Sequence, residues 1–499
     1  MPKRKVHKKR IVILGAGQVG RHLVRILSRD GYNVVLIDQK EDKIAETLDA
    51  NDVSTILADG LDPAVYKEIG LNKNDAFIAV TTGDETNLLA CSISKSFGCD
   101  TNIARVKKPY FTESKHSLFN SGFWKNLGIE VLFNQTELTV KEVKHLIENP
   151  GAEEAIEVHD KRVQLIAYRV KKSSLLCDHR LMGLRHVKKF ENLVVAAVTT
   201  TTETDGNIIQ KSKILNQRLK KRLKRSAIRK YNREDEVTLV PTGNYRIKEG
   251  DLLFICGLRQ DFKGLGQLFD PELTTHSKHI FILGGNPLAS TLAENLKDSY
   301  PKKQVYLIEP NKSKAYFQTE RINPKVNILL GGIHNINTYK NEGLDENCVF
   351  IGASRTEDDN LLASILFKEE TQVRTIAIVQ KPTNKHLIPF LEIDAAVSPK
   401  LLLVDDVLHA LQKSMFDVIS AKGHNSELIE FNVPSSSDIS NKQIKEIKFP
   451  SDSIIVTIFR NETVIIPKGD TLILPDDKVV VFTLKKAISE VQLFFDSHK

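Results

Sequence analysis

Short apolar runs and amphipathic stretches alternate along the chain. Six runs have the length and apolar content of buried strands, at residues 10–14, 33–37, 53–57, 75–80, 101–106 and 130–133. Helical spacing of apolar positions follows several of these runs, over about 18–29, 41–49 and 84–97. This order predicts a parallel sheet that is covered by helices on both faces.

The pattern changes after the last of these strands. Residues 136–148 have the spacing of an amphipathic helix, which Asn149, Pro150 and Gly151 end. Its apolar stripe is typical of a helix that faces a core, and the alternative is a dimer arm. Shorter alternating runs then predict strands at 155–158, 163–170, 193–198, 236–240 and 251–256. We therefore expect a small strand-rich domain after the helix.

A glycine-rich turn joins the first predicted strand to the first predicted helix. Gly15 permits the tight turn, Gly17 lets the backbone approach a pyrophosphate, and Gly20 lets the helix pack on the strand. The N–H groups and the dipole of the helix start favour an anion there. A turn that serves packing alone is the alternative. The residues predicted to form this phosphate loop are Gly15, Ala16, Gly17, Gln18, Val19 and Gly20.

Polar residues stand where the predicted strands end. Asp38 ends the second strand, 21 residues beyond Gly17, where a carboxylate can accept the hydroxyls of an adenosine ribose and would repel a 2′-phosphate. Ligands of parallel sheets bind beyond the carboxyl ends of the strands. We therefore add to the predicted site the residues at the other strand ends, Asp59, Gly60, Thr81, Thr82 and Arg105.

The whole arrangement occurs twice in the sequence. Residues 279–286 repeat the opening strand and loop, and residues 304–309 repeat the second strand and its acid. Corresponding residues are 264–273 positions apart as far as the helix, but 226 apart in the small domain, which places an insertion of roughly 38 residues near 200–233. A duplicated two-domain unit is a strong indication of architecture.

The second copy departs from the phosphate-loop pattern. Gly284 is kept, but Asn286 and Ala289 replace the second and third glycines, and Ile378 replaces the arginine of the fifth strand. Ala is tolerated at the third position, whereas Asn at the second places a side chain where a pyrophosphate must approach. Although Gly284 and the acid Glu309 remain candidate ligand residues, we expect the second site to be weak, altered or empty.

Composition excludes several classes of protein. The chain of 499 residues has ordinary apolar and charged content, no apolar run long enough to span a membrane, and no signal-peptide core after its basic start. Its five cysteines are scattered and form no CxxC pair, which fits a reducing compartment and gives no metal signature. We predict neither a metal site nor catalytic residues.

The net charge of +8 comes from two local segments. Residues 1–10 carry +6 and residues 202–233 carry +9, so the rest of the chain is net acidic. A general attraction to nucleic acid is therefore not supported. Within the second segment, Leu215, Leu219 and Leu223 have helical spacing. This insertion is interpreted as a solvated loop, with contact to anionic lipid headgroups or to nucleic acid as the alternatives.

The tandem order and these motifs resemble the TrkA family over about residues 10–485. The family comprises cytosolic regulatory subunits of Trk-type potassium uptake systems, built from RCK (or KTN) domains with TrkA-C lobes. The resemblance implies a homo-oligomeric ring of RCK domains at the inner face of the cell membrane. It also implies a potassium-translocating partner of the TrkH or TrkG type, and NAD(H) or ATP/ADP as regulatory ligands. It assigns phosphates to the first loop, ribose to Asp38, adenine to Asp59 and a terminal phosphate to Arg105.

The predicted fold class is α/β, with two Rossmann-type doubly wound parallel-sheet domains, each followed by a small β-rich TrkA-C-like lobe. The predicted segments are a basic tail (1–9), a first Rossmann domain (10–134), a linking helix (135–150), a first lobe (151–272, with the insertion 202–233), a second Rossmann domain (278–398), a linking helix (399–424), a second lobe (425–485) and a C-terminal helix (486–499).

Two other functions stay open. An NAD-dependent oxidoreductase would need a substrate domain with a general acid or base, but the lobes are short and repeated. His145 and His409 occupy equivalent places in the two linking helices, and we interpret them as core or interface residues. A nucleic-acid-binding Rossmann protein would use the basic insertion, and we regard this partner as the less favoured one. We expect a protein that is not an enzyme.

Overall fold

The computed structural model describes most of the chain between residues 10 and 495. The described ranges are 10–29, 31–48, 53–112, 121–158, 162–184, 186–201, 236–273, 277–381, 388, 391–413, 418–420 and 426–495. The basic tail 1–9 lies outside these residues, as does the insertion 202–233, the segment with lipid headgroups or nucleic acid as alternative partners.

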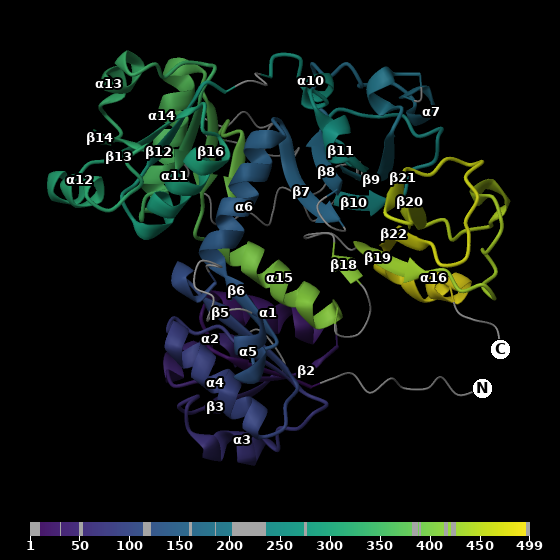
Figure 1. The fold of residues 1–499 in the computed structure, drawn as a ribbon, viewed down its shortest axis with the longest axis horizontal. Coiled ribbons are helices and arrows are strands. Elements are labelled where there is room, and N and C mark those ends of the chain that lie inside the picture. Colours follow the sequence, from purple (N-terminus) through teal and green to yellow (C-terminus); the bar gives the residue numbers. More distant parts are fainter. Residues whose placement is uncertain are drawn as a thin grey trace, which may run out of the picture.

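The first Rossmann domain is built on a six-stranded parallel sheet with the order β3-β2-β1-β4-β5-β6. Its helices lie on both faces, as the apolar runs predicted, because strands buried on both sides need two covering layers (Figure 1). Its elements are β1 (Arg10–Leu14), α1 (Gln18–Arg29), β2 (Asn33–Asp38), α2 (Glu41–Leu48), β3 (Ser54–Leu57), α3 (Pro63–Ile69), β4 (Ala76–Ala79), α4 (Asp84–Ser96), β5 (Thr101–Val106), α5 (Ser121–Asn126) and β6 (Val131–Asn134).

The second Rossmann domain repeats this topology with the order β14-β13-β12-β15-β16-β17. The duplication seen in the sequence is therefore present in the fold. Its elements are β12 (His279–Leu283), α11 (Pro287–Ser299), β13 (Gln304–Glu309), α12 (Lys312–Thr319), β14 (Asn327–Leu330), α13 (Ile336–Asn341), β15 (Val349–Gly352), α14 (Glu357–Thr371), β16 (Arg374–Ile378) and β17 (Ala395–Val397).

The two linking helices exchange places between the halves. Helix α6 (Gln135–Glu148) packs Val143 and Leu146 into the core of the second Rossmann domain. Helix α15 (Pro399–Lys413) packs Leu403 and Val407 into the core of the first. Figure 1 shows the two helices in contact between the Rossmann domains. The stripe predicted for 136–148 thus faces a core, but that core belongs to the other half of the chain.

Each linking helix is followed by a lobe with a five-stranded antiparallel sheet, and the two strand orders correspond. Apolar residues of both sheets form one cluster, so the lobes pack face to face as a sandwich. The first lobe contains β7 (Ala152–Val158), β8 (Val163–Arg169), α7 (Leu181–Leu184), η2 (Lys188–Phe190), β9 (Leu193–Thr201), β10 (Glu236–Leu239), β11 (Leu252–Leu258), η4 (Arg259–Phe262) and α10 (Gly266–Phe269). The second contains β18 (Val418–Ser420), β19 (Ser426–Asn432), β20 (Ser453–Arg460), β21 (Thr463–Ile465), β22 (Lys478–Leu484) and α16 (Ile488–Phe495).

These sheets confirm the predicted α/β class, and one predicted helix is corrected. The second linking helix was expected to reach residue 424, but α15 ends at Lys413 and residues 418–420 form β18. The chain leaves the helix because β18 pairs with β19 and forms the edge strand of the second lobe. Strand β7 holds the same position in the first lobe. The insertion lies between β9 and β10, where the equivalent strands β20 and β21 are joined by Asn461 and Glu462 alone. No helix within the described residues has the length and apolar character needed to cross a bilayer.

Replacing Leu403 by Ala tests the helix exchange. Leu403 is fully buried, so the change is expected to lower the free energy of unfolding by about 2–5 kcal/mol. Its cluster lies in the first Rossmann domain, so hydrogen exchange measured by mass spectrometry should accelerate in β1 and α1. Leu493→Ala, at a side chain that is 63% exposed, is the control and should change neither quantity. Unchanged protection of β1 in Leu403→Ala would contradict the exchange.

Candidate functional site

A cavity of about 1360 Å³ lies at the carboxyl ends of the first Rossmann sheet. It is lined by the glycine loop, by the loops after β2, β3, β4 and β5, and by the start of α6. The second half of the chain closes it with residues of the equivalent loop and with the start of α15. The helix exchange therefore places the carboxyl ends of both sheets around one space.

The three glycines of the loop meet different steric demands. Gly15 has a φ of +110°, and a Cβ there would lie 3.0 Å from the backbone nitrogen of Thr81. At Gly20 a Cβ would lie 1.8 Å from the carbonyl oxygen of Gly15, so helix α1 can approach the loop only with glycine. At Gly17 a Cβ would meet nothing within 4 Å. Gly17 thus keeps the cavity open, whereas Gly15 and Gly20 shape the loop.

Asp38 is buried at the end of β2 and holds the loop in place. Its Oδ2 accepts a hydrogen bond of 2.6 Å from the Ala16 backbone N–H, and its Oδ1 accepts one of 2.9 Å from the Lys40 backbone N–H. A carboxylate has about four acceptor positions, so two remain for ligand hydroxyls. The side chain lines the cavity beside Lys43, whose Nζ is 4.0 Å from Oδ2. Asp38 can therefore orient the loop and, at the same time, accept hydrogen bonds from ribose hydroxyls.

Arg105 lies at the end of β5 with its guanidinium in the cavity. Nη1 donates to the Thr81 carbonyl oxygen at 3.2 Å and Nη2 donates to Gln135 Oε1. The residue is 9% exposed, and among the described residues its Nε has no hydrogen-bond partner. Burial disfavours the charged form of Arg105 and so lowers its pKa, and an anionic ligand would favour the charged form again.

Asn87 fixes the ends of β4 and β5 beside this arginine. Its Oδ1 accepts hydrogen bonds from the backbone N–H (2.9 Å) and hydroxyl (2.7 Å) of Thr81, and its Nδ2 donates to the Arg105 carbonyl oxygen at 2.8 Å. Asn360 makes the equivalent bonds to Ser354 and Ile378 in the second copy. The repeated asparagine is thus a structural residue that positions the site.

Further cations surround the cavity and come from both halves. Lys107 is the first residue after β5, and burial, helped by the charge of Arg105, lowers the pKa of Lys107. Lys400, in the first turn of α15, donates from Nζ to Gln18 Oε1. Burial and then the positive charge of Arg105 lower the pKa of Lys400. Arg355 also lines the cavity from the second Rossmann domain. Adjacent cations with lowered pKa values favour a ligand with several negative charges.

The second glycine loop is filled by side chains of the second Rossmann domain. Asn286 Oδ1 accepts a hydrogen bond from the Ala289 N–H at 3.1 Å and caps α11, while its Nδ2 donates to the Ala353 carbonyl oxygen at 2.6 Å. Gln318 Nε2 donates to the Gly285 carbonyl oxygen at 2.7 Å. Glu309 is buried and accepts from the Asn311 N–H at 2.8 Å. The Ala289 N–H, a helix-start donor that a phosphate would use, is therefore already bonded, and the Glu309 carboxylate lies against Gly285.

The structure brings most of the predicted site residues together around the first cavity. Ala16 and Gly20 support the loop without lining the cavity, and Gly284 and Glu309 belong to the filled second loop. The predicted residues that do line the cavity are Gly15, Gly17, Gln18, Val19, Asp38, Asp59, Gly60, Thr81, Thr82 and Arg105.

Sequence reasoning missed two groups of lining residues. Lys107 and Lys108 directly follow Val106, the last residue of the predicted strand, so the strand end already indicated their position. Asn286, Arg355 and Lys400 lie far away in the sequence, and only the exchange of helices brings them to the first loop. The described residues contain no group of three or more His, Cys, Asp or Glu side chains placed to hold a metal ion.

Comparison with protein families gives matches in both halves. The family model described as TrkA-N domain matches residues 11–120 and 280–399. The model described as TrkA-C domain matches residues 428–496. Together these segments cover more than half of the chain.

Individual relatives match nearly the full length. The chain is 26% identical over 495 residues to the Trk system potassium uptake protein TrkA of Vibrio alginolyticus, covering 97% of this chain and 98% of that protein. It is 25% identical over 492 residues to the TrkA homolog 1 of Methanosarcina mazei, with 97% and 99% covered. Among solved structures, a GsuK channel bound to NAD has a TM-score of 0.55 at 15% identity, with 99% of this chain and 80% of that chain covered. This last likeness concerns the fold alone.

Proposed function

This chain belongs to the TrkA family, and we propose that it is the nucleotide-sensing regulatory subunit of a potassium uptake system. The observation that supports a sensor is the cavity at the first glycine loop, which has an open phosphate position at Gly17 and cations from both halves of the chain. Relatives of this chain are named as potassium uptake proteins, which supports potassium uptake as the process that it regulates.

The ligand is NAD(H), ATP or ADP, bound at the glycine loop of the first Rossmann domain and not at that of the second. Its phosphates lie at Gly17 and the start of α1, with Arg105 at the terminal phosphate and Asp38 at the ribose. Asp59, Gly60, Thr81 and Thr82 complete the site around the base and sugar. A GsuK channel that shares this fold was solved with NAD, which supports a dinucleotide as one of these ligands. The second loop binds no nucleotide, because Asn286 bonds the helix-start N–H of Ala289 and the Glu309 carboxylate lies against Gly285.

Binding is coupled to the arrangement of the halves through Lys400 and Arg355. Both cations belong to the second half of the sequence but line the cavity of the first. A ligand whose phosphates attract them favours the state in which the halves lie close together. Such differential binding typically shifts an equilibrium by about 1–3 kcal/mol. The shift is transmitted to a potassium-translocating membrane subunit by a homo-oligomeric ring at the inner face of the cell membrane.

Potassium uptake in a deletion strain tests this function. A strain of the source organism that lacks this gene should grow poorly at low external potassium, and a plasmid copy should restore both growth and rubidium-86 uptake. The Gly17→Trp copy should restore neither nucleotide dependence nor normal uptake, although the protein accumulates to the same level. Normal uptake in the deletion strain would contradict the assignment. Oxidation of NADH by the purified protein with hydroxy or amino acids would favour an oxidoreductase instead.

A further inference from the structure

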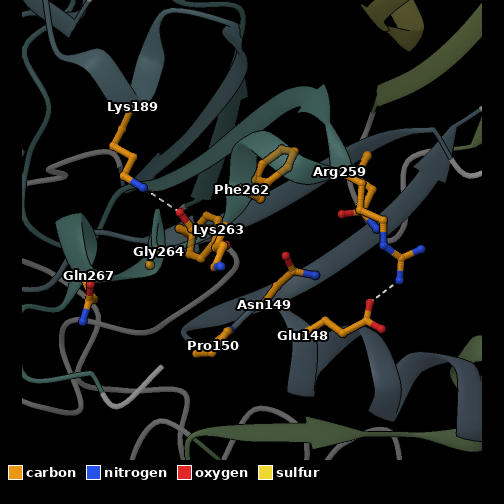
Figure 2. A pocket seen from close by; sticks show the side chains of 12 residues that line it. Glu148, Asn149, Pro150, Lys189, Arg259, Phe262, Lys263, Gly264 and Gln267 are labelled. Atoms are coloured by element: carbon orange, nitrogen blue, oxygen red, sulfur yellow. Dashed lines mark hydrogen bonds and ion pairs between the residues drawn. The ribbon is translucent and has the colours of Figure 1, made fainter. Parts of the chain in front are cut away.

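A second cavity, of about 400 Å³, lies between the C-terminal end of α6 and the first lobe (Figure 2). Its lining comes from the turn after α6, from strand β8, and from the segment that runs from η4 to α10. It shares no lining residue with the nucleotide cavity. Its volume lies within the range of pockets that bind small molecules.

Gln164 is the buried polar group of this second cavity. It lies on β8, on the same face as Ile166 and Tyr168, and is 1% exposed. In the part of the chain that the structure describes, neither its Nε2 nor its Oε1 has a hydrogen-bond partner. An unpaired buried amide costs about 1–3 kcal/mol. The arrangement is therefore suited to a ligand that supplies an acceptor and a donor side by side.

The acidic residue opposite Gln164 is already engaged. Glu157 is its partner across the sheet on β7. Burial raises the pKa of Glu157, but hydrogen bonds from His145 and Lys141 outweigh this effect and hold it at about 2. Because the Glu157 carboxylate is bonded to His145 and Lys141, the amide of Gln164 is left to face the cavity.

Aromatic side chains form apolar walls near this amide. Tyr168 and Phe262 both line the cavity and are buried. The Tyr168 ring is stacked on Phe269, with ring centroids 4.8 Å apart and planes inclined by 16°, so its position is fixed. Rigid aromatic walls next to an amide favour a planar group at the buried end of a ligand.

The charges of the cavity are divided between its two ends. Figure 2 shows the pair formed by Glu148 and Arg259 at one end, and Lys189 and Lys263 at the other. Glu148 also accepts a hydrogen bond of 3.2 Å from the Tyr300 hydroxyl. Lys189 Nζ donates to the Lys263 carbonyl oxygen at 2.7 Å, which keeps this ammonium at the cavity. Because Glu148 is paired, the two exposed lysines leave the lysine end positively charged.

We propose that this second cavity binds an organic anion of mononucleotide size. Its planar heterocyclic end carries an adjacent hydrogen-bond donor and acceptor that pair with Gln164, as a nucleobase edge does with a glutamine amide. Its phosphate lies at Lys189 and Lys263. The site does not depend on the function proposed for the first cavity.

The position of the second cavity connects it to both halves of the chain. The end of α6 that lines it is held by Arg374 of the second Rossmann domain, whose Nη2 donates to the Leu146 carbonyl oxygen. Tyr300 of the same domain contacts Glu148. A bound ligand therefore lies at the junction of the first lobe, the linking helix and the second Rossmann domain.

Calorimetric titration of the full chain tests this site. The chain carries Gly17→Trp to block the first cavity, and the probes are AMP, UMP and inorganic phosphate at low salt. At least one mononucleotide should bind with one site per chain. In the same background, Gln164→Leu should weaken that binding at least tenfold, whereas Gln260→Leu, at an exposed η4 residue that does not line the cavity, should not.

A second variant keeps the test valid if Gln164→Leu does not fold. Lys263→Glu changes an exposed side chain and should also weaken mononucleotide binding at least tenfold. Absence of mononucleotide binding, or binding that both substitutions leave unchanged, overturns the proposal. Binding of inorganic phosphate as tight as that of AMP and UMP overturns the role of Gln164. None of these outcomes bears on nucleotide binding by the unsubstituted first cavity.

Discussion

Replacing Gly17 by Trp is expected to weaken binding of ATP, ADP and NADH at least 100-fold, which corresponds to about 2.7 kcal/mol. Gly17 lines the first cavity, and a Cβ at this position would meet no other atom within 4 Å. A side chain can therefore leave the backbone here without a clash at its Cβ, and an indole extends into the space that the phosphates need. Fluorescence-based titration with each nucleotide measures the loss.

Gly183→Trp is the matched control for this experiment. Gly183 has the same open surroundings, because a Cβ there would also meet nothing within 4 Å, and it lines neither cavity. Both variants should keep the melting temperature and circular dichroism of the unsubstituted chain, and Gly183→Trp should keep its nucleotide affinity. If Gly17→Trp binds ATP and NADH normally, the phosphate position is wrong.

The first loop and its surroundings could be predicted because their determinants are local. Gly15 needs a positive φ and Gly20 has a close backbone neighbour, and both demands arise within one strand–turn–helix unit. Asp38 and Arg105 end buried strands of one parallel sheet, so the sheet topology alone brings them to one edge. The apolar runs indicated this topology for both copies, since a parallel sheet must be covered on both faces.

The contribution of the second half to the first site could not be predicted in the same way. An amphipathic stripe on α6 or α15 indicates burial but does not say which core the helix enters. Both helices enter the core of the opposite half, and this exchange brings Lys400 next to Gln18. The substitution at Asn286 indicated a defective second loop, but its role as a helix cap is visible only in the hydrogen bonds of the structure.

This exchange of helices gives the degenerate second copy a role at the ligand site of the first. If the second copy served only as a scaffold, the charge of its loops would be irrelevant to the ligand. Instead, Arg355 and Lys400 lie at the cavity of the first copy, and the pKa of Lys400 is lowered by burial and, in part, by Arg105. The protein without ligand thus holds neighbouring positive charges that repel each other, and an anionic ligand relieves this repulsion.

Replacing Lys400 by Ala should therefore weaken ATP binding about tenfold, or about 1.4 kcal/mol, and NADH binding much less. ATP carries more negative charge than NADH, so it gains more from a cation supplied by the other half. The difference between the two nucleotides should shrink at high salt, because screening weakens the contact. Lys312→Ala, in the first turn of α12 and outside the cavity, is the control that should leave both affinities unchanged.

Combining Lys400→Ala with Arg105→Ala distinguishes a shared phosphate site from two separate effects. Arg105→Ala alone should lower the affinity for ATP about 10–100-fold, as expected for loss of a charge-assisted hydrogen bond of about 1.5–3 kcal/mol. If both cations act on the same terminal phosphate, the two losses should not add, since each substitution also relieves the repulsion felt by the other cation. Strictly additive losses of equal size for ATP and NADH would show that Lys400 does not contact the ligand. The second half would then cover the cavity without contributing to electrostatic recognition of the phosphates.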